Sequence, residues 1–235
     1  MAAWVKSRPF TSAYIVIISA VFLKLGFGST TICETLAEQF ICANAIWAVN
    51  LTADPIQFVF SFFTAPWFHN GFTHFILIFV CLLIICQTAE VRIGTRRTIL
   101  MFFLGTLGVG TLISIILNVG FAHSDAYWFE DGMTRNWMGG SVGLYFVMGA
   151  LFAQIKNPRT AVSIYLVLDM LNLFVLHGAG SHTVLAHTLA VLAGVTIGWR
   201  WREVEYATAN VLQVNGAGLE SVIESIDEPA EPSKQ

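Results

Sequence analysis

Ser141 lies in a five-residue motif, Gly-Gly-Ser-Val-Gly over 139–143, that matches the G-x-S-x-G around the nucleophile of many hydrolases. In soluble hydrolases that serine lies on a sharp turn between a buried strand and a helix. Here a polar loop precedes the motif, and an unbroken apolar run, residues 144–153, follows it. Ser141 is therefore expected about one turn into a hydrophobic helix, in an architecture other than that of the soluble hydrolases.

Histidines provide the other half of a nucleophilic site. His187 lies about one turn into the last apolar segment, and His69 and His74 lie at the start of the second. An imidazole can take the hydroxyl proton while the serine oxygen attacks a carbonyl, and can then return that proton to the leaving amine. We therefore predict a catalytic pair of Ser141 and His187. The alternative is that Ser141 only hydrogen-bonds the backbone of its own helix.

The composition is typical of a membrane protein. Charged residues make up 11% of the chain and hydrophobic residues 56%, whereas soluble domains are roughly one-quarter charged. Crossing roughly 30 Å of hydrocarbon takes about 20 apolar residues. Long apolar stretches without strict alternation favour helices over a barrel. We predict an all-α, polytopic membrane protein with six transmembrane helices, near residues 11–28, 70–88, 98–120, 138–155, 160–177 and 183–199.

The positive charges predict the orientation of these spans, because Lys and Arg favour cytoplasmic loops. Lys and Arg residues lie next to every span on one side of the membrane. The loops on the opposite side contain Arg135 as their one basic residue, together with several carboxylates. Both termini are therefore predicted to be cytoplasmic, in a multi-pass protein of the plasma membrane. Ser141 and the three histidines then share the outer ends of their spans, where polar groups normally face a water-filled cavity. The basic residues of the cytoplasmic side are Lys6, Arg8, Arg92, Arg96, Arg97, Lys156, Arg159, Arg200 and Arg202.

We divide the chain into a membrane domain, residues 1–202, and an acidic tail, residues 203–235, that is expected to be disordered in the cytoplasm. Within the domain, residues 29–60 are expected to lie in the outer interface. Cys33 and Cys42 fall there, and they either close a disulfide loop or lie on different faces of one helix. Membrane lipids are the expected surroundings, and no basic patch with interleaved aromatics suggests nucleic acid.

Small residues predict close helix packing around the catalytic pair. Counted from His187, three of them fall at i+3, i+7 and i+11 and share one helical face. Such faces let neighbouring backbones approach closely, as a Ser–His hydrogen bond of roughly 2.6 to 3.2 Å requires. The residues are Ala190, Gly194 and Gly198 on the last span, with Gly139, Gly140, Gly143 and Gly149 on the fourth.

Together these features resemble the rhomboid family of intramembrane serine proteases. That family opens its second span with F-x-H-x-x-x-x-H-x-x-x-N, which is similar to WFHNGFTHFILI over 67–78, and it carries a glutamate and a glycine in the next loop, similar to Glu90 and Gly94. Its nucleophile lies in G-x-S-G followed by an aromatic residue and M-G, and its base lies in A-H-x-x-G-x-x-x-G. The matching residues are Gly139, Gly140, Ser141, Tyr145, Met148 and Gly149, and Ala186, His187 and Gly194.

The resemblance implies a serine endopeptidase whose Ser141/His187 dyad lies in a water-accessible cavity and has no carboxylate third member. It implies that His74 and the backbone N–H of Ser141 hold the oxyanion, with Gly140 in support, and that Tyr145 packs beside the His187 ring. The substrate would be a transmembrane helix of another protein, which enters sideways, unwinds locally and is cut near the outer interface.

Three positions depart from the family pattern. Ile78 stands where the family has its oxyanion asparagine, Val142 replaces the glycine after the nucleophile, and Ala190 replaces the first glycine after the histidine. Losing one oxyanion donor costs a hydrolase about 100- to 1,000-fold in rate. The alternative function is therefore a rhomboid-like pseudoprotease that binds membrane-protein clients without cutting them. Retention of both Ser141 and His187 favours the enzyme.

Metal or haem binding is a third class of function. His69 and His74 are five residues apart, which on one helix would point them about 140° from each other and away from a common ion. By the resemblance, His69 is structural. We predict neither metal nor cofactor.

Two groups of polar residues remain. Asp169 and Asn172 are the deep polar pair of the fifth span and are expected to form a hydrogen-bonded anchor between helices. His123, His177 and His182 lie in or near outer loops, where we expect them to be solvated.

Overall fold

The structure is a computed structural model that describes residues 8–171 and 181–202. The acidic tail, residues 203–235, and the end of the fifth predicted span, which contains Asn172 and His177, therefore lie outside the described residues.

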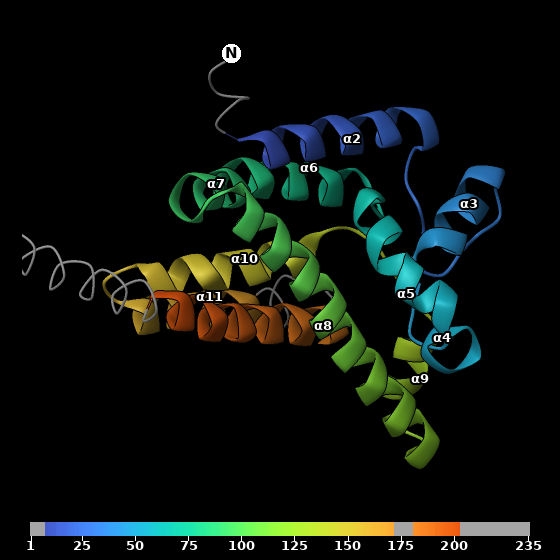
Figure 1. Cartoon of the computed structure of the whole chain (residues 1–235). Helices are drawn as coiled ribbons and strands as arrows, with labels where there is room; N and C mark the ends of the chain where they lie inside the picture. Colours follow the sequence, from blue (N-terminus) through green and yellow to red (C-terminus); the bar gives the residue numbers. More distant parts are fainter. Residues whose placement is uncertain (1–7, 172–180, 203–235) are drawn as a thin grey trace, which may run out of the picture.

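A helix lies in each of the six predicted segments (Figure 1). The second of these helices contains a π-helical segment, η2, between α6 and α7, and the three together run from Phe72 to Ile93. The six are α2 (Pro9–Leu25), α6 (Phe72–Cys81) with η2 (Leu82–Cys86) and α7 (Gln87–Ile93), α8 (Thr95–His123), α10 (Ser141–Gln154), α11 (Pro158–Leu171) and the helix Ser181–Arg202.

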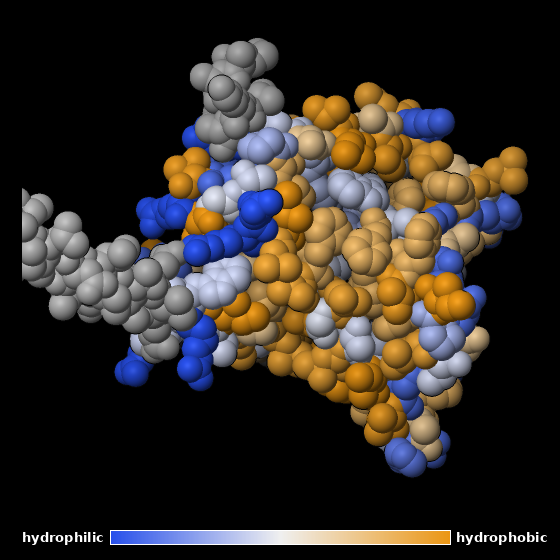
Figure 2. All heavy atoms as spheres, in the orientation of Figure 1, coloured by the Kyte–Doolittle hydropathy of each residue, from blue (hydrophilic) through white to orange (hydrophobic). Residues whose placement is uncertain are grey.

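Three of these helices are long and apolar enough to cross a membrane, namely Phe72–Ile93, Thr95–His123 and Ser181–Arg202, and α2 and α10 are shorter apolar helices. Figure 2 shows apolar side chains over the middle of one face, with hydrophilic residues gathered toward its two ends. This is the pattern of a protein whose middle faces lipid. The predicted all-α membrane bundle is confirmed.

Short elements gather at one end of the bundle (Figure 1). They are α3 (Leu36–Asn44), α4 (Asn50–Ala53), α5 (Pro55–Thr64) with the 3₁₀ turn η1 (Ala65–Trp67), and α9 (Tyr127–Met133). Two short strands, β1 (Ile46–Trp47) and β2 (Asn136–Trp137), pair antiparallel, with Ile46 opposite Trp137 and Trp47 opposite Asn136. The segment after the first span is thereby joined to the residues just before Ser141.

A disulfide between Cys33 and Cys42 strengthens this connection. The structure thus selects one of the two alternatives left open by the spacing of these cysteines. Asn136 of β2 donates from Nδ2 to the carbonyl of Ser29 at 2.9 Å and to Sγ of Cys42 at 3.6 Å. The disulfide-closed loop therefore contacts the strand that leads into α10.

Glycines set the packing of α10 against the helix Ser181–Arg202. A Cβ at Gly149 would overlap the carbonyl of Val191, and one at Gly194 would overlap the carbonyl of Phe146. One at Gly198 would lie 2.8 Å from the Cα of Ala150. The predicted face of small residues on the last span thus lies against α10, and the two backbones are in close contact there.

Glu90 ties the ends of three helices to one another. Its buried carboxylate accepts hydrogen bonds from the N–H groups of Phe10 (3.0 Å) and Thr11 (2.8 Å) at the start of α2. It also accepts one from Oγ1 of Thr95, the first residue of α8, at 3.0 Å. A carboxylate at a helix N-terminus satisfies N–H groups that lack a partner within the helix and is stabilised by the helix dipole.

Candidate active site

Ser141 is the first residue of α10, rather than one turn into it as predicted. The reason is the backbone just before it. Gly139 has a φ of +90°, outside the helical range, so α10 cannot extend back through it. Its N–H donates to the carbonyl of Ala65 at 2.9 Å. The N-cap residue Gly140 follows, so the chain turns sharply and presents Ser141 at the helix end.

This position suits an oxyanion site. The first N–H groups of a helix have no acceptor inside that helix, and the N-terminus carries partial positive charge. The N–H of Ser141 is one of these groups, because α10 begins at this residue. Negative charge developing beside Ser141 would therefore be stabilised by backbone already in place.

His187 is 7% exposed and is held by an aromatic contact. Its ring stacks on that of Tyr145 with centroids 3.9 Å apart and planes 22° from parallel. Tyr145 follows Ser141 by four residues, which places both on one face of α10. Within the described part of the chain, Nε2 of His187 is buried and has no hydrogen-bond partner. The expected hydrogen bond with Ser141 is therefore not made at this nitrogen in the structure.

His74 presents a hydrogen-bond donor to the loop before Ser141. Its Nδ1 accepts a hydrogen bond from the N–H of Asn70 at 3.4 Å. A neutral imidazole has one acceptor nitrogen and one N–H, so this bond assigns the proton to Nε2. That nitrogen would lie 3.0 Å from a Cβ built on Gly139. His74 thus lies against the loop that leads into α10.

His69 is buried beside His74, with ring centroids 5.3 Å apart. The expectation that these rings diverge is wrong, because His69 precedes α6 and the helical spacing does not apply to it. Burial, together with the neighbouring His74, lowers the pKa of His69 to about 3. Among residues 8–171 and 181–202, no cluster of three potential metal ligands occurs, and the carbonyl of His69 accepts from the N–H of Gly28 at 2.9 Å.

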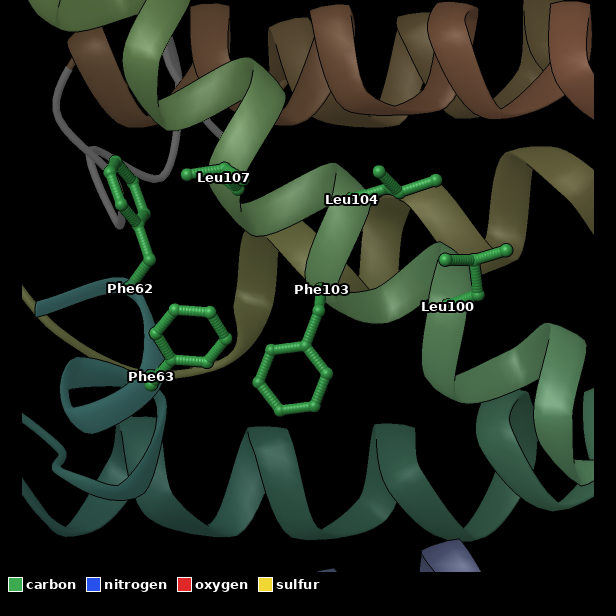
Figure 3. A pocket seen from close by; sticks show the side chains of 6 residues that line it. All are labelled: Phe62, Phe63, Leu100, Phe103, Leu104 and Leu107. Atoms are coloured by element: carbon green, nitrogen blue, oxygen red, sulfur yellow. The ribbon is translucent and has the colours of Figure 1, made fainter. Parts of the chain in front are cut away.

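Four of these groups, His74, Ser141, Tyr145 and His187, line one cavity of about 740 Å³, whereas His69 does not. It takes Ser141 and Tyr145 from α10, His74 from α6 and His187 from the helix Ser181–Arg202. A second, much smaller hollow lies between α5 and α8 and is lined only by Phe and Leu side chains (Figure 3). It lacks any group that could do chemistry, so the larger cavity is the candidate active site.

The comparison with protein families agrees with this geometry. The model described as Rhomboid domain matches residues 57–203, more than half of the 235 residues. The chain belongs to the rhomboid family. That family consists mostly of serine-type intramembrane proteases, and the matched range includes all the residues that line the cavity from α6, α10 and the last helix. No match was found among curated proteins or among solved structures.

Two departures from the rhomboid pattern face this cavity. Ile78 is 2% exposed and lines the wall on α6, and Val142 lines it on α10 directly after Ser141. The third, Ala190, is buried in the packed core of the last helix. The rhomboid cavity therefore has an aliphatic side chain where the family has an amide donor.

The structure adds three residues that the sequence did not connect with the site. Tyr165 of α11 donates from its hydroxyl to Oδ2 of Asp169 at 2.8 Å, and Thr188 donates to the same oxygen at 3.2 Å. Asp169 is an interhelical anchor as predicted, and its partners here are these two hydroxyls. The spacing of Tyr165 and Asp169, four residues apart in one span, was a signal that could have found this pair.

His182 is buried, contrary to the expectation that it is solvated. Its ring stacks on Trp128 at 4.2 Å, and its Nε2 lies 2.7 Å from the Trp128 carbonyl. The cause is α9, which packs against the start of the last helix and covers the ring. His123, the last residue of α8, is exposed as expected.

Proposed function

We propose that this rhomboid protein is an intramembrane serine endopeptidase that cleaves transmembrane-helix substrates near the outer membrane interface with a Ser141/His187 dyad. The observation that carries the proposal is that Ser141, His187 and His74, from three different helices, line one cavity while Tyr145 stacks on His187. The elements of nucleophilic catalysis thus share a single space.

In the proposed reaction, Oγ of Ser141 attacks the scissile carbonyl carbon while His187 takes the hydroxyl proton. The carbonyl oxygen becomes an oxyanion, to which the N–H of Ser141 and Nε2–H of His74 donate. The C–N bond then breaks, and His187 returns the proton to the leaving amine. A water molecule repeats the sequence on the acyl-enzyme and releases the carboxyl product and the free serine.

The substrate class follows from the place of the site in a membrane bundle. An intact helix holds its carbonyls in backbone hydrogen bonds, and lipid offers no replacement partners. A transmembrane substrate must therefore unwind at small or helix-breaking residues before attack, in a cavity that supplies water and polar partners. The predicted topology puts this cavity on the outer side, with both termini in the cytoplasm.

A pseudoprotease that binds membrane-protein clients is the second candidate, and one observation favours it. Ile78 and Val142 put aliphatic side chains into the cavity where the family has an amide donor and a glycine. Because one oxyanion donor is worth about 100- to 1,000-fold in rate, this change lowers turnover, yet the backbone donor and His74 remain. Retention of the serine and the histidine supports the enzyme.

Reconstitution tests the proposal. The full chain is placed in lipid vesicles with a single-span substrate that carries small residues near its outer end. Cleavage is compared among the unmodified protein, Ser141→Ala and His187→Ala. We expect cleavage by the unmodified protein and none by either variant. Cleavage that survives both substitutions would exclude the dyad, and client binding without cleavage would favour the pseudoprotease.

A further inference from the structure

A buried carboxylate lies close to the proposed dyad and is not used in the reaction above. Asp169 of α11 is 5% exposed, and its Oδ2 accepts hydrogen bonds from Tyr165 at 2.8 Å and Thr188 at 3.2 Å. Burying a carboxylate is costly unless it is hydrogen-bonded. The two hydroxyls supply those bonds from two helices, so the group links α11 to the helix Ser181–Arg202.

Each of the two hydroxyl donors is connected to the imidazole of His187, one along the chain and one through ring contacts. Thr188 is the next residue along the helix. Tyr165 packs its ring against Tyr145 with centroids 5.5 Å apart, and Tyr145 stacks on His187 at 3.9 Å. Asp169 therefore closes a circuit of contacts through α10, α11 and the last helix, in which the ring of Tyr145 contacts both Tyr165 and His187.

The other side of α11, within Pro158–Leu171, is largely apolar. Ile164, Val167 and Leu168 are exposed apolar side chains, as suits a face toward lipid. The inward face carries Tyr165 and Asp169, the two buried residues of this helix. The Asp169 hydrogen bonds therefore belong to the buried face of α11 and tie it to the last helix.

The geometry points to Asp169 as a positioning residue for the dyad, one that holds the ring of His187 toward Ser141 through Thr188 and through the Tyr165–Tyr145 stack. This rests on the proposed function, and Asp169 itself touches none of the reacting atoms. Small displacements matter in such a site, because moving a catalytic group by about 1 Å can cost about 100-fold in rate.

The test measures the rate at which a fluorophosphonate probe labels Ser141 in the full chain, so that no protein substrate is needed. Asp169→Leu removes the acceptor and should slow labelling by roughly 10- to 100-fold. Asp169→Asn keeps an acceptor oxygen of the same shape and should restore most of the rate. Met170→Leu, on the same helix and outside the circuit, is the matched control and should label like the unmodified protein.

The pH profile separates positioning from general destabilisation. With His187 in place as the base, the labelling rate should reach a plateau as pH rises, whereas in Asp169→Leu it should keep rising because hydroxide replaces the displaced imidazole. Tyr165→Phe and Thr188→Val each remove one hydroxyl with little change of shape, and each should slow labelling less than Asp169→Leu. If Asp169→Leu does not fold, the labelling rates of these two variants test the inference instead.

The outcomes distinguish the inference from the function on which it rests. If the unmodified protein is labelled at Ser141 and the Asp169, Tyr165 and Thr188 variants match its rate, positioning by Asp169 is overturned while the dyad stands. The same holds if the variants slow labelling but keep the plateau, since only stability has then changed. If the unmodified protein is not labelled at all, the proposed function fails and this inference fails with it.

Discussion

Ile78 occupies the place of an amide donor in the family, four residues after His74, and its side chain lines the cavity. We predict that Ile78→Asn raises the cleavage rate by at least about tenfold, because an added oxyanion donor stabilises the charge of the transition state. The measurement is the turnover rate of a reconstituted single-span substrate. Ile78→Leu keeps the aliphatic character and should leave the rate unchanged. A folded Ile78→Asn protein without any gain would remove this position from the oxyanion site.

The sequence predicted the candidate site residues where they belong to a recognisable motif. The motifs named Ser141, His187, His74 and Tyr145, and the structure brings these four to one cavity. The start of α10 was misjudged, because the φ of +90° at Gly139 is a local backbone state that the apolar run after it does not reveal.

Thr188, the partner of Asp169 on the last helix, was missed for a different reason. Which residue of a neighbouring helix meets a buried carboxylate depends on the rotation and offset of the two helices. No single-sequence pattern records those quantities.

Among the helices, the contact of α10 with the helix Ser181–Arg202 determines whether a serine and a histidine can meet. Gly194→Leu should abolish cleavage and lower the melting temperature, because a Cβ there overlaps the Phe146 carbonyl and the backbones must move apart. Overpacking costs typically about 1–3 kcal/mol of folding free energy. Thermal unfolding and substrate cleavage are measured together.

Gly108→Leu is the matched control for this substitution. Gly108 is exposed on α8 and has open space where a Cβ would lie. It should therefore keep both the melting temperature and the activity. Equal behaviour of the two variants would show that the close approach at Gly194 is dispensable.

The spans were predictable because hydrophobic length is a strong signal, and each predicted segment contains a helix. The short elements that gather at one end of the bundle were not predictable in this way. β1 and β2 are two residues each, too short for a period-2 pattern, and their pairing joins positions about 90 residues apart in the sequence. The sequence alone did not decide whether Cys33 and Cys42 form a disulfide, because their spacing suits either a closed loop or two faces of one helix.

The distribution of charge over the molecule predicts its orientation. Basic residues flank the spans on one side, next to both termini, and Glu90 links helix ends on that side. Because Lys and Arg favour cytoplasmic loops, an epitope tag after Gln235 should be digested by protease added to sealed inside-out vesicles. It should be protected in right-side-out vesicles. The reverse pattern would place the cavity on the cytoplasmic side and contradict the predicted topology.

The cavity is a property of the assembled bundle. Its walls come from α6, α10 and the last helix, together with residues near β2. Motif spacing indicated that these groups share a depth, but the cavity exists only once glycine contacts and the β1–β2 pair have set the helices against one another.

The central claim is that Ser141 is a nucleophile activated by His187. Its most direct test is the mass of the intact protein after treatment with a fluorophosphonate, with the modified residue located by peptide mapping. We predict one adduct, on Ser141, that disappears in Ser141→Ala and also in His187→Ala, where the serine is still present. An adduct that forms equally well without the imidazole, or the absence of any adduct on Ser141, would contradict the account.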